Sequence, residues 1–143
     1  MTALNKQALR QKAVKAGGEE WQSRKEPGIG GEYTVIVKGS LVKHQGWSTH
    51  RPVADEVADK KTMDFIATAN PATVLALLDE LESAEKRIAE LSASHSKLRD
   101  TMATIHNTIR MDGGYTPLAA ILNAAKRAYE ESASAAGIGV KVG

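Results

Sequence analysis

Apolar residues recur at alternating steps of three and four over residues 74–109, which is the spacing of a coiled-coil seam. The seam positions are Val74, Leu77, Leu81, Ala84, Ile88, Leu91, His95, Leu98, Met102, Ile105 and Ile109. A helix with one apolar stripe buries it against other helices, and this repeat lasts for roughly five heptads. The pattern therefore predicts a homo-oligomer, a dimer or a tetramer, with these side chains at the oligomerisation interface.

Both ends of this long helix carry local signals. Asn70 followed by Pro71 is typical of a capping residue and a first helical position, and Asp112-Gly113-Gly114 ends the pattern. Thr116 and Pro117 then predict the start of another helix. Its apolar stripe comprises Leu118, Ile121, Leu122, Ala125 and Tyr129. We expect this second helix to fold back on the first as a helical hairpin.

The composition of the seam bears on the number of helices. Leu75 and Leu78 broaden the apolar stripe at its amino-terminal end, which favours a tetramer or a dimer of helical hairpins over a two-stranded rod and leaves the helix direction open. Ala84 permits close approach of helices, and His95 places a polar ring at a core position, so both favour a specific register. His95 is interpreted either as a tolerated polar core residue or as a pH sensor.

The residues before position 70 alternate in the manner of short strands. Residues 33–38 predict a strand, and Gly39-Ser40 predicts a tight turn into residues 41–43, which together make a β-hairpin. Residues 52–57 predict a third strand, confined to a sheet edge by Pro52. Ahead of these, Thr2 and Gly17-Gly18 bound a helix that ends near Ala16, and residues 19–31 are expected to form a loop.

These elements predict an α+β fold that is mostly α and oligomeric. The expected order is a small α+β domain over residues 1–69 (helix, β-hairpin, short helix), a long coiled-coil helix over residues 70–111, a C-terminal helix over residues 112–132 and a flexible tail over residues 133–143. The two long helices are expected to form the helical hairpin.

Composition narrows the functional classes. Aromatic residues make up only 4% of the 143 residues, so a large ring-lined enzyme pocket is not expected. The chain has no cysteine, and it has neither a secretion signal nor an apolar run long enough to span a membrane, which predicts a cytoplasmic protein. Residues 1–51 carry nine Lys and Arg against four Glu, so this third of the chain is mildly basic.

No residue pattern indicates catalysis or a cofactor. His44 and His50, with Asp55 and Glu56 nearby, match no standard zinc spacing, so we predict no metal site. The carboxylates of the long helix are interpreted as a solvated face rather than as a general acid and base. The serines beside His95 do not face it on a helix. We therefore expect a protein that is not an enzyme and that needs no cofactor.

Two groups of residues are candidates for contacts with other molecules. The predicted partner-binding residues combine aromatic and basic side chains around the hairpin: Tyr33, Lys38, Lys43, Trp47 and Arg51. Trp21 and Trp47 are alternatively core residues of the small domain. The predicted nucleic-acid contacts of a second hypothesis are Lys6, Arg10, Lys12, Lys15, Arg24 and Lys25.

Three segments resemble a known family. They are MTALNKQALR at the start, FIATANPATVLALLDELESAEKRIAEL at residues 65–91 and AAGIGVKVG at the end. They are similar to the Ead-like early-region proteins of lambdoid phages and prophages, and the resemblance covers about a third of the chain. Residues 17–64 and 92–134 carry no resemblance. The resemblance implies an accessory phage protein, made early in infection or on prophage induction, that self-associates through a coiled coil and brings no catalytic residues.

The leading hypothesis is a non-enzymatic oligomeric phage accessory protein in the cytoplasm of the bacterial host. It binds and modulates a host or phage protein, as an inhibitor or adaptor in host takeover, counter-defence or developmental control, because multiple copies strengthen weak contacts. The alternative is a DNA-associated regulator whose basic amino-terminal region is presented in several copies. A purely structural oligomer is a third class. Partners are therefore the chain itself and a protein, with nucleic acid second and no membrane.

Overall fold

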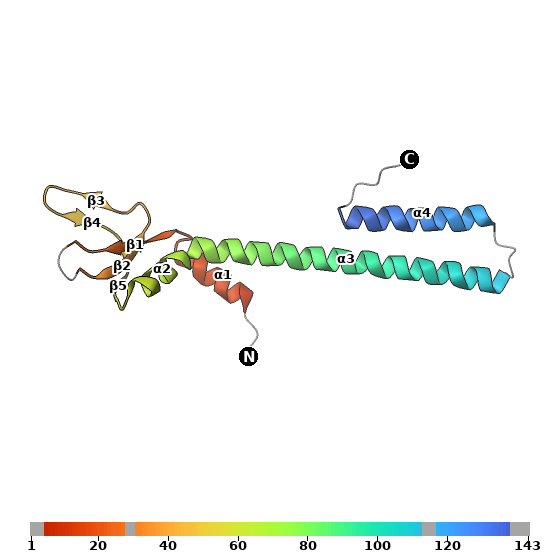
Figure 1. The fold of residues 1–143 in the computed structure, drawn as a ribbon, viewed down its shortest axis with the longest axis horizontal. Helices are drawn as coiled ribbons and strands as arrows, with labels where there is room; N and C mark the ends of the chain where they lie inside the picture. Colours follow the sequence, from red (N-terminus) through yellow and green to blue (C-terminus); the bar gives the residue numbers. More distant parts are fainter. Residues whose placement is uncertain (1–4, 28–30, 113–116, 138–143) are drawn as a thin grey trace. The chain divides into compact units, whose positions relative to one another are not determined.

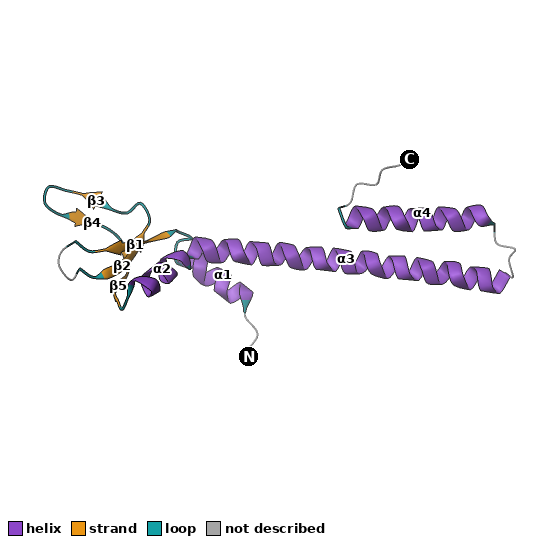
Figure 2. Ribbon diagram, in the orientation of Figure 1, coloured by secondary structure: helices purple, strands orange, loops and turns teal. Residues whose placement is uncertain are grey.

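The computed structural model describes residues 5–27, 31–112 and 117–137, and Figures 1 and 2 show the fold. The elements in chain order are α1 (Lys6–Lys15), β1 (Trp21–Lys25), β2 (Tyr33–Val37), β3 (Val42–Lys43), β4 (Ser48–Thr49), β5 (Pro52–Val57), α2 (Lys60–Thr68), α3 (Pro71–Asp112) and α4 (Leu118–Ala135). The predicted fold class is confirmed: the chain is mostly helical, with an N-terminal helix, a small sheet, a long helix and a C-terminal helix. The chain divides into two compact units, Met1–Leu81 and Glu82–Gly143.

A three-stranded antiparallel sheet lies in the first unit, in the order β1-β2-β5. β2 pairs with β1 in one unbroken register and with β5 in a register interrupted by bulges. The predicted hairpin is wrong in its pairing, because β3 pairs with β4 and not with β2. Ser40 explains the departure: its hydroxyl donates to the Val37 carbonyl at 2.6 Å and accepts from the Arg51 amide at 3.1 Å. The turn thus leads the chain out of the sheet, and β5 takes the place beside β2.

β1 lies in the segment that was predicted to be a loop, so that prediction is wrong over residues 21–25. Its sequence, WQSRK, has one large apolar residue and no simple alternation of apolar and polar positions. The strand is held by tertiary contacts instead. Ser23 donates from its hydroxyl to Asp64 of α2 at 2.7 Å, and Trp21 packs against the core. Packing of this kind overrides weak local β propensity.

The core of the first unit lies between the sheet and α2. Val35, Met63 and Ala67 form the buried cluster, and partly buried side chains surround it, including Trp21, Tyr33 and Ile66. Side chains alternate between the two faces of a strand, so Val35 points toward α2 while Ile36 points away. Both are fully buried. The central strand is therefore covered on both faces, which accounts for its run of β-branched residues.

Side-chain caps set the helix boundaries of the first unit. Asp59 accepts from the backbone N–H groups of Lys61 at 2.8 Å and Thr62 at 3.0 Å, and so begins α2. Asn5 accepts from the Ala8 amide at 2.9 Å and begins α1. The predicted cap, Thr2, lies outside the described residues, and the described helix starts at Lys6.

Asn70 and Pro71 begin α3 as predicted, and Asn70 accepts from the Thr73 amide at 2.8 Å. The first turns of α3 contribute to the first unit through Leu78, which is buried. The Arg10 guanidinium of α1 contacts the Asp79 carboxylate at 2.8 Å. The amino-terminal end of the long helix is thus attached to the small domain by both apolar and ionic contacts.

In the second unit, α4 lies alongside the carboxy-terminal part of α3. α4 extends to Ala135, into the segment predicted as a tail, because Ala133 is buried and the Arg87 guanidinium donates to the Ala136 carbonyl at 2.8 Å. The predicted cap Thr116 lies outside the described residues, as do residues 138–143 of the tail. The Cα atoms of α3 and α4 scarcely approach within 8 Å of each other, so the two helices are widely spaced for a packed pair.

Candidate oligomerisation and recognition surfaces

Most large apolar side chains of the α3 seam are exposed. The exposed members are Leu77, Leu81, Ile88, Leu91, Met102 and Ile109. Each leaves at least 38% of its surface open to solvent, and Ile88 leaves 64%. Single exposed apolar residues are ordinary, but a row of them at heptad spacing on one helix is not. We name this row, with Val74, Ala84, His95, Leu98 and Ile105, the α3 seam.

α4 covers one side of the α3 seam rather than its centre. The partly buried residues of α3 in the second unit are Ser94, Leu98, Thr101, Ile105 and Thr108. Only Leu98 and Ile105 among them belong to the seam. Ala128 of α4 faces Leu98 across one groove, and Ile121 faces Ile105 across another. The predicted α4 stripe is therefore only partly inward: Ile121 faces α3, whereas Leu118, Leu122 and Tyr129 are exposed.

An open groove of about 470 Å³ separates the two helices near the carboxy-terminal end of α4. Its walls carry small side chains, among them Ala93 and Ser94 on α3 and Ala128, Ser132 and Ala135 on α4. Protein interiors are close-packed, and such a volume between two helices is not that of a finished helical core. The hairpin of α3 and α4 is thus an incomplete bundle by itself.

The β3–β4 hairpin presents an exposed aromatic pair at its tip. The rings of His44 and Trp47 are stacked, with centroids 3.9 Å apart and planes inclined by 14°. The His44 amide donates to the Trp47 carbonyl at 2.8 Å, and Gly46 takes the positive φ of 82° that the tight turn needs. Trp47 is 61% exposed. Of the two alternatives for the tryptophans, Trp21 is a core residue and Trp47 is a surface residue.

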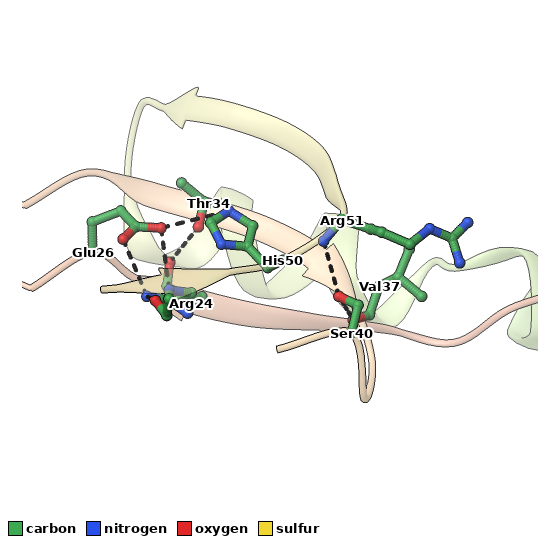
Figure 3. Close-up of polar contacts among 8 residues, drawn as sticks. Arg24, Glu26, Thr34, Val37, Ser40, His50 and Arg51 are labelled. Atoms are coloured by element: carbon green, nitrogen blue, oxygen red, sulfur yellow. Dashed lines mark hydrogen bonds and ion pairs between the residues drawn. The ribbon is translucent and has the colours of Figure 1, made fainter. Parts of the chain in front are cut away.

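A polar cluster that sequence reasoning missed fixes the base of this hairpin to the sheet (Figure 3). Arg24 on β1 contacts Glu26 at 3.1 Å through Nε and donates to the Ser48 hydroxyl at 3.1 Å through Nη2. His50 Nε2 lies 3.8 Å from the Glu26 carboxylate. The only sequence signal was the presence of charged residues in two segments far apart in the chain, which does not indicate their contact. The cluster holds the hairpin on the face of the sheet opposite α2.

The five predicted partner-binding residues do not form one patch. Lys43 and Trp47 lie together on the hairpin. Tyr33 lies on the α2 face of the sheet, with Lys25 Nζ 5.5 Å from the centre of its ring, so its grouping with Trp47 is wrong. Lys38 pairs with Glu20. Arg51 donates to both carboxylate oxygens of Glu19, at 2.8 and 3.1 Å, and this pairing raises the pKa of the guanidinium.

The six basic residues of the nucleic-acid hypothesis are also divided. Arg10 and Arg24 are engaged in the ion pairs with Asp79 and Glu26, and Arg24 and Lys25 point to opposite faces of the sheet. Lys6 is partly buried. Lys12, Lys15 and Lys25 are exposed.

Among the described residues, no group of three or more His, Cys, Asp or Glu side chains is placed to hold a metal ion. None of the described helices is long and apolar enough to cross a membrane.

Comparison with protein-family models gives a match over most of the chain. The family model described as Ead/Ea22-like protein matches residues 2–137, which is nearly the whole chain. No curated protein and no solved structure gives a significant match.

Proposed function

We infer the function of this chain from its family and from the surfaces that its fold leaves exposed. The chain belongs to the Ead/Ea22-like protein family. That membership makes it a phage accessory protein. We propose that it self-associates through the α3 seam and that the oligomer binds and modulates a host or phage protein through the β3–β4 hairpins of its amino-terminal units. The observation that carries this proposal is the row of exposed apolar side chains along α3.

The α3 seam supports self-association in energetic terms. Burying a Leu, Ile or Met side chain contributes about 1.5–3 kcal/mol. The six exposed seam residues together offer an amount of order 10 kcal/mol, which is comparable with the free-energy cost of joining two molecules. A second copy supplies the same heptad spacing, so its seam fits this one along the full length. The groove between α3 and α4 provides room for the added side chains.

The β3–β4 hairpin supports recognition. Trp47 is large, exposed and held in place by its stack on His44, which lowers the entropy lost on binding. The contacts of Arg24 and Ser40 fix the base of the hairpin. A surface of this size binds weakly by itself. Several copies on one oligomer raise its apparent affinity, which explains why a small domain is attached to a long helix.

The test is capture of partners from infected and uninfected bacterial lysates by the tagged full chain, with and without nuclease. We expect a stoichiometric protein partner that resists nuclease and is lost with Trp47→Ala. Phe65→Ala is the matched control, since Phe65 of α2 is also exposed, at 72%, but lies outside the hairpin. Equal capture by all three proteins contradicts the hairpin as the recognition surface.

The same experiment decides the alternative of a DNA-associated regulator. Exposure of Lys12 and Lys15 on α1 favours that function. This alternative predicts that the captured partners are lost when nuclease is added and that DNA binding falls steeply with added salt. The variant Lys12→Glu with Lys15→Glu then abolishes binding while Trp47→Ala leaves it intact.

A further inference from the structure

β1 is an edge strand whose outer backbone groups are unused within the described part of the chain. The backbone N–H of Glu26 donates to the Glu32 carbonyl at 2.8 Å, and the backbone N–H of Lys38 donates to the Glu20 carbonyl at 2.9 Å. These two bonds show which residues of β1 are hydrogen-bonded to β2. In this pattern the even residues of β1 bond to β2. The N–H and C=O groups of Trp21, Ser23 and Lys25 therefore point outward, and no hydrogen bond between described residues takes them up.

The other edge of the sheet is protected in ways that β1 is not. β5 begins with Pro52, is bulged against β2 and has Glu56 at a positive φ of 51°. Proline and bulges are two of the devices that prevent strand addition at an edge. β1 is unbulged over its five residues and contains no proline. Strand addition is thus blocked at one edge and open at the other.

We propose that β1 pairs with β1 of a second copy, antiparallel and with Ser23 opposite Ser23, to make one continuous sheet across a two-fold axis. In this register the outward groups of Trp21, Ser23 and Lys25 bond to those of Lys25, Ser23 and Trp21 of the second copy. Such a contact is isologous, so one pairing uses up the free edge of both copies. It is an interface separate from the α3 seam.

Side-chain chemistry selects this register over its neighbours. Centring the pair on Arg24 places two guanidiniums directly opposite each other, which is destabilising. Centring it on Gln22 leaves Lys25 beyond the end of the other strand and loses its hydrogen bonds. With Ser23 at the centre, Lys25 of each copy lies opposite Trp21 of the other, a favourable cation–aromatic pair.

The flanking charges are compatible with the same register. At each end of the pairing, Glu20 of one copy lies opposite Glu26 of the other. Each of these carboxylates already contacts a cation within its own chain: Glu20 contacts Lys38, and Glu26 contacts Arg24. The paired cations reduce the repulsion between the two glutamates. A second copy is therefore an occupant that the edge accepts over its whole length.

The test is residue-resolved amide hydrogen exchange on the full chain by NMR. We expect the amides of Trp21, Ser23 and Lys25 to exchange about tenfold or more slowly than unbonded amides and to lose this protection on dilution. Ser23→Pro removes the outward N–H without touching the β1–β2 ladder, and it abolishes the protection of Trp21 and Lys25. Ser23→Ala is the matched control, since both variants lose the hydroxyl contact with Asp64 but only proline lacks the N–H.

The contrary results are distinct. If the amides of Trp21, Ser23 and Lys25 exchange fast while those of Gln22 and Arg24 exchange slowly, the proposal is overturned. It is also overturned if the three outward amides are protected but neither dilution nor Ser23→Pro changes that protection. Slow Gln22 and Arg24 amides also show that the Ser23→Pro variant is folded, and the dilution series on the unaltered chain needs no variant. A failure of the α3 seam is recognised separately. Leu81→Asp with Ile88→Asp places two charges on the seam, and if the seam is not an interface this chain keeps the solution mass of the unaltered chain, whatever the β1 amides show.

Discussion

Asn70 joins two helices through hydrogen bonds made in opposite directions. Its amide nitrogen donates to the Ala67 carbonyl at 2.9 Å, and its amide oxygen accepts from the Thr73 N–H at 2.8 Å. The residue is buried, so water does not replace either bond when it is lost. One side chain thus ends α2 and begins α3.

This geometry predicts that Asn70→Ala lowers the free energy of unfolding by about 1–2 kcal/mol. The variant loses the cap on the Thr73 N–H and leaves the Ala67 carbonyl without the hydrogen bond that Asn70 donates. Asn70→Asp keeps the acceptor for Thr73 and loses only the donor to Ala67, so we expect an intermediate value. Urea unfolding followed by circular dichroism measures both. An Asn70→Ala chain as stable as the unaltered one contradicts the account of this junction.

Asp59 and Asp64 predict acid sensitivity of the first unit. Hydrogen bonds from Thr62 lower the pKa of Asp59, and the Lys60 ammonium, followed by the Ser23 hydroxyl, lowers the pKa of Asp64. A carboxyl whose pKa is lower in the folded state stabilises the fold above its ordinary value of 3.8 and loses that contribution as the pH falls toward the folded value. We expect Asp64→Asn to be less stable than the unaltered chain at pH 6 and the difference to shrink below about pH 4. A difference in urea midpoint that stays constant with pH contradicts this.

The α3 helix shows which information a sequence carries at the scale of an element. The Asn70-Pro71 signal and the heptad spacing gave its start and its apolar stripe, because both depend on neighbours within the same helix. The strand order failed, because β1 depends on Ser23 meeting Asp64 forty-one residues later. The Arg24 cluster escaped notice for the same reason. Periodicity within a segment shows which face of a helix or strand is apolar, whereas the pairing of strands depends on contacts between residues distant in sequence.

The seam predicts a specific response to charge. Leu81→Asp with Ile88→Asp places carboxylates on the apolar stripe, where burial of a charge is costly, so we expect the seam interface to be lost and the solution mass to fall below that of the unaltered chain. Ser83→Asp with Ala89→Asp adds the same charge at exposed positions of α3 outside the seam and leaves the mass unchanged. Sedimentation equilibrium distinguishes the two variants. Equal masses for both pairs show that the seam is not an interface.

At the scale of the whole molecule, the chain divides its tasks between two units. The first unit, Met1–Leu81, carries a small covered sheet and a hairpin with an exposed tryptophan, and the second, Glu82–Gly143, carries the remaining α3 seam and α4. The apolar stripe of α3 was predictable from the sequence, whereas the β3–β4 hairpin that carries Lys43 and Trp47 was not, because the prediction paired residues 41–43 with residues 33–38. The separation of Tyr33 from that group was not predictable either, because alternation assigns a strand residue to one of two faces without saying what covers each face.

The mass of the full chain in solution tests the central claim most directly. Sedimentation equilibrium of the purified, untagged chain at micromolar concentrations is predicted to give a dimer or tetramer of the 15.3 kDa monomer. A mass of 15.3 kDa at every concentration contradicts the account, because the exposed row of Leu, Ile and Met side chains on α3 then has no second copy to cover it.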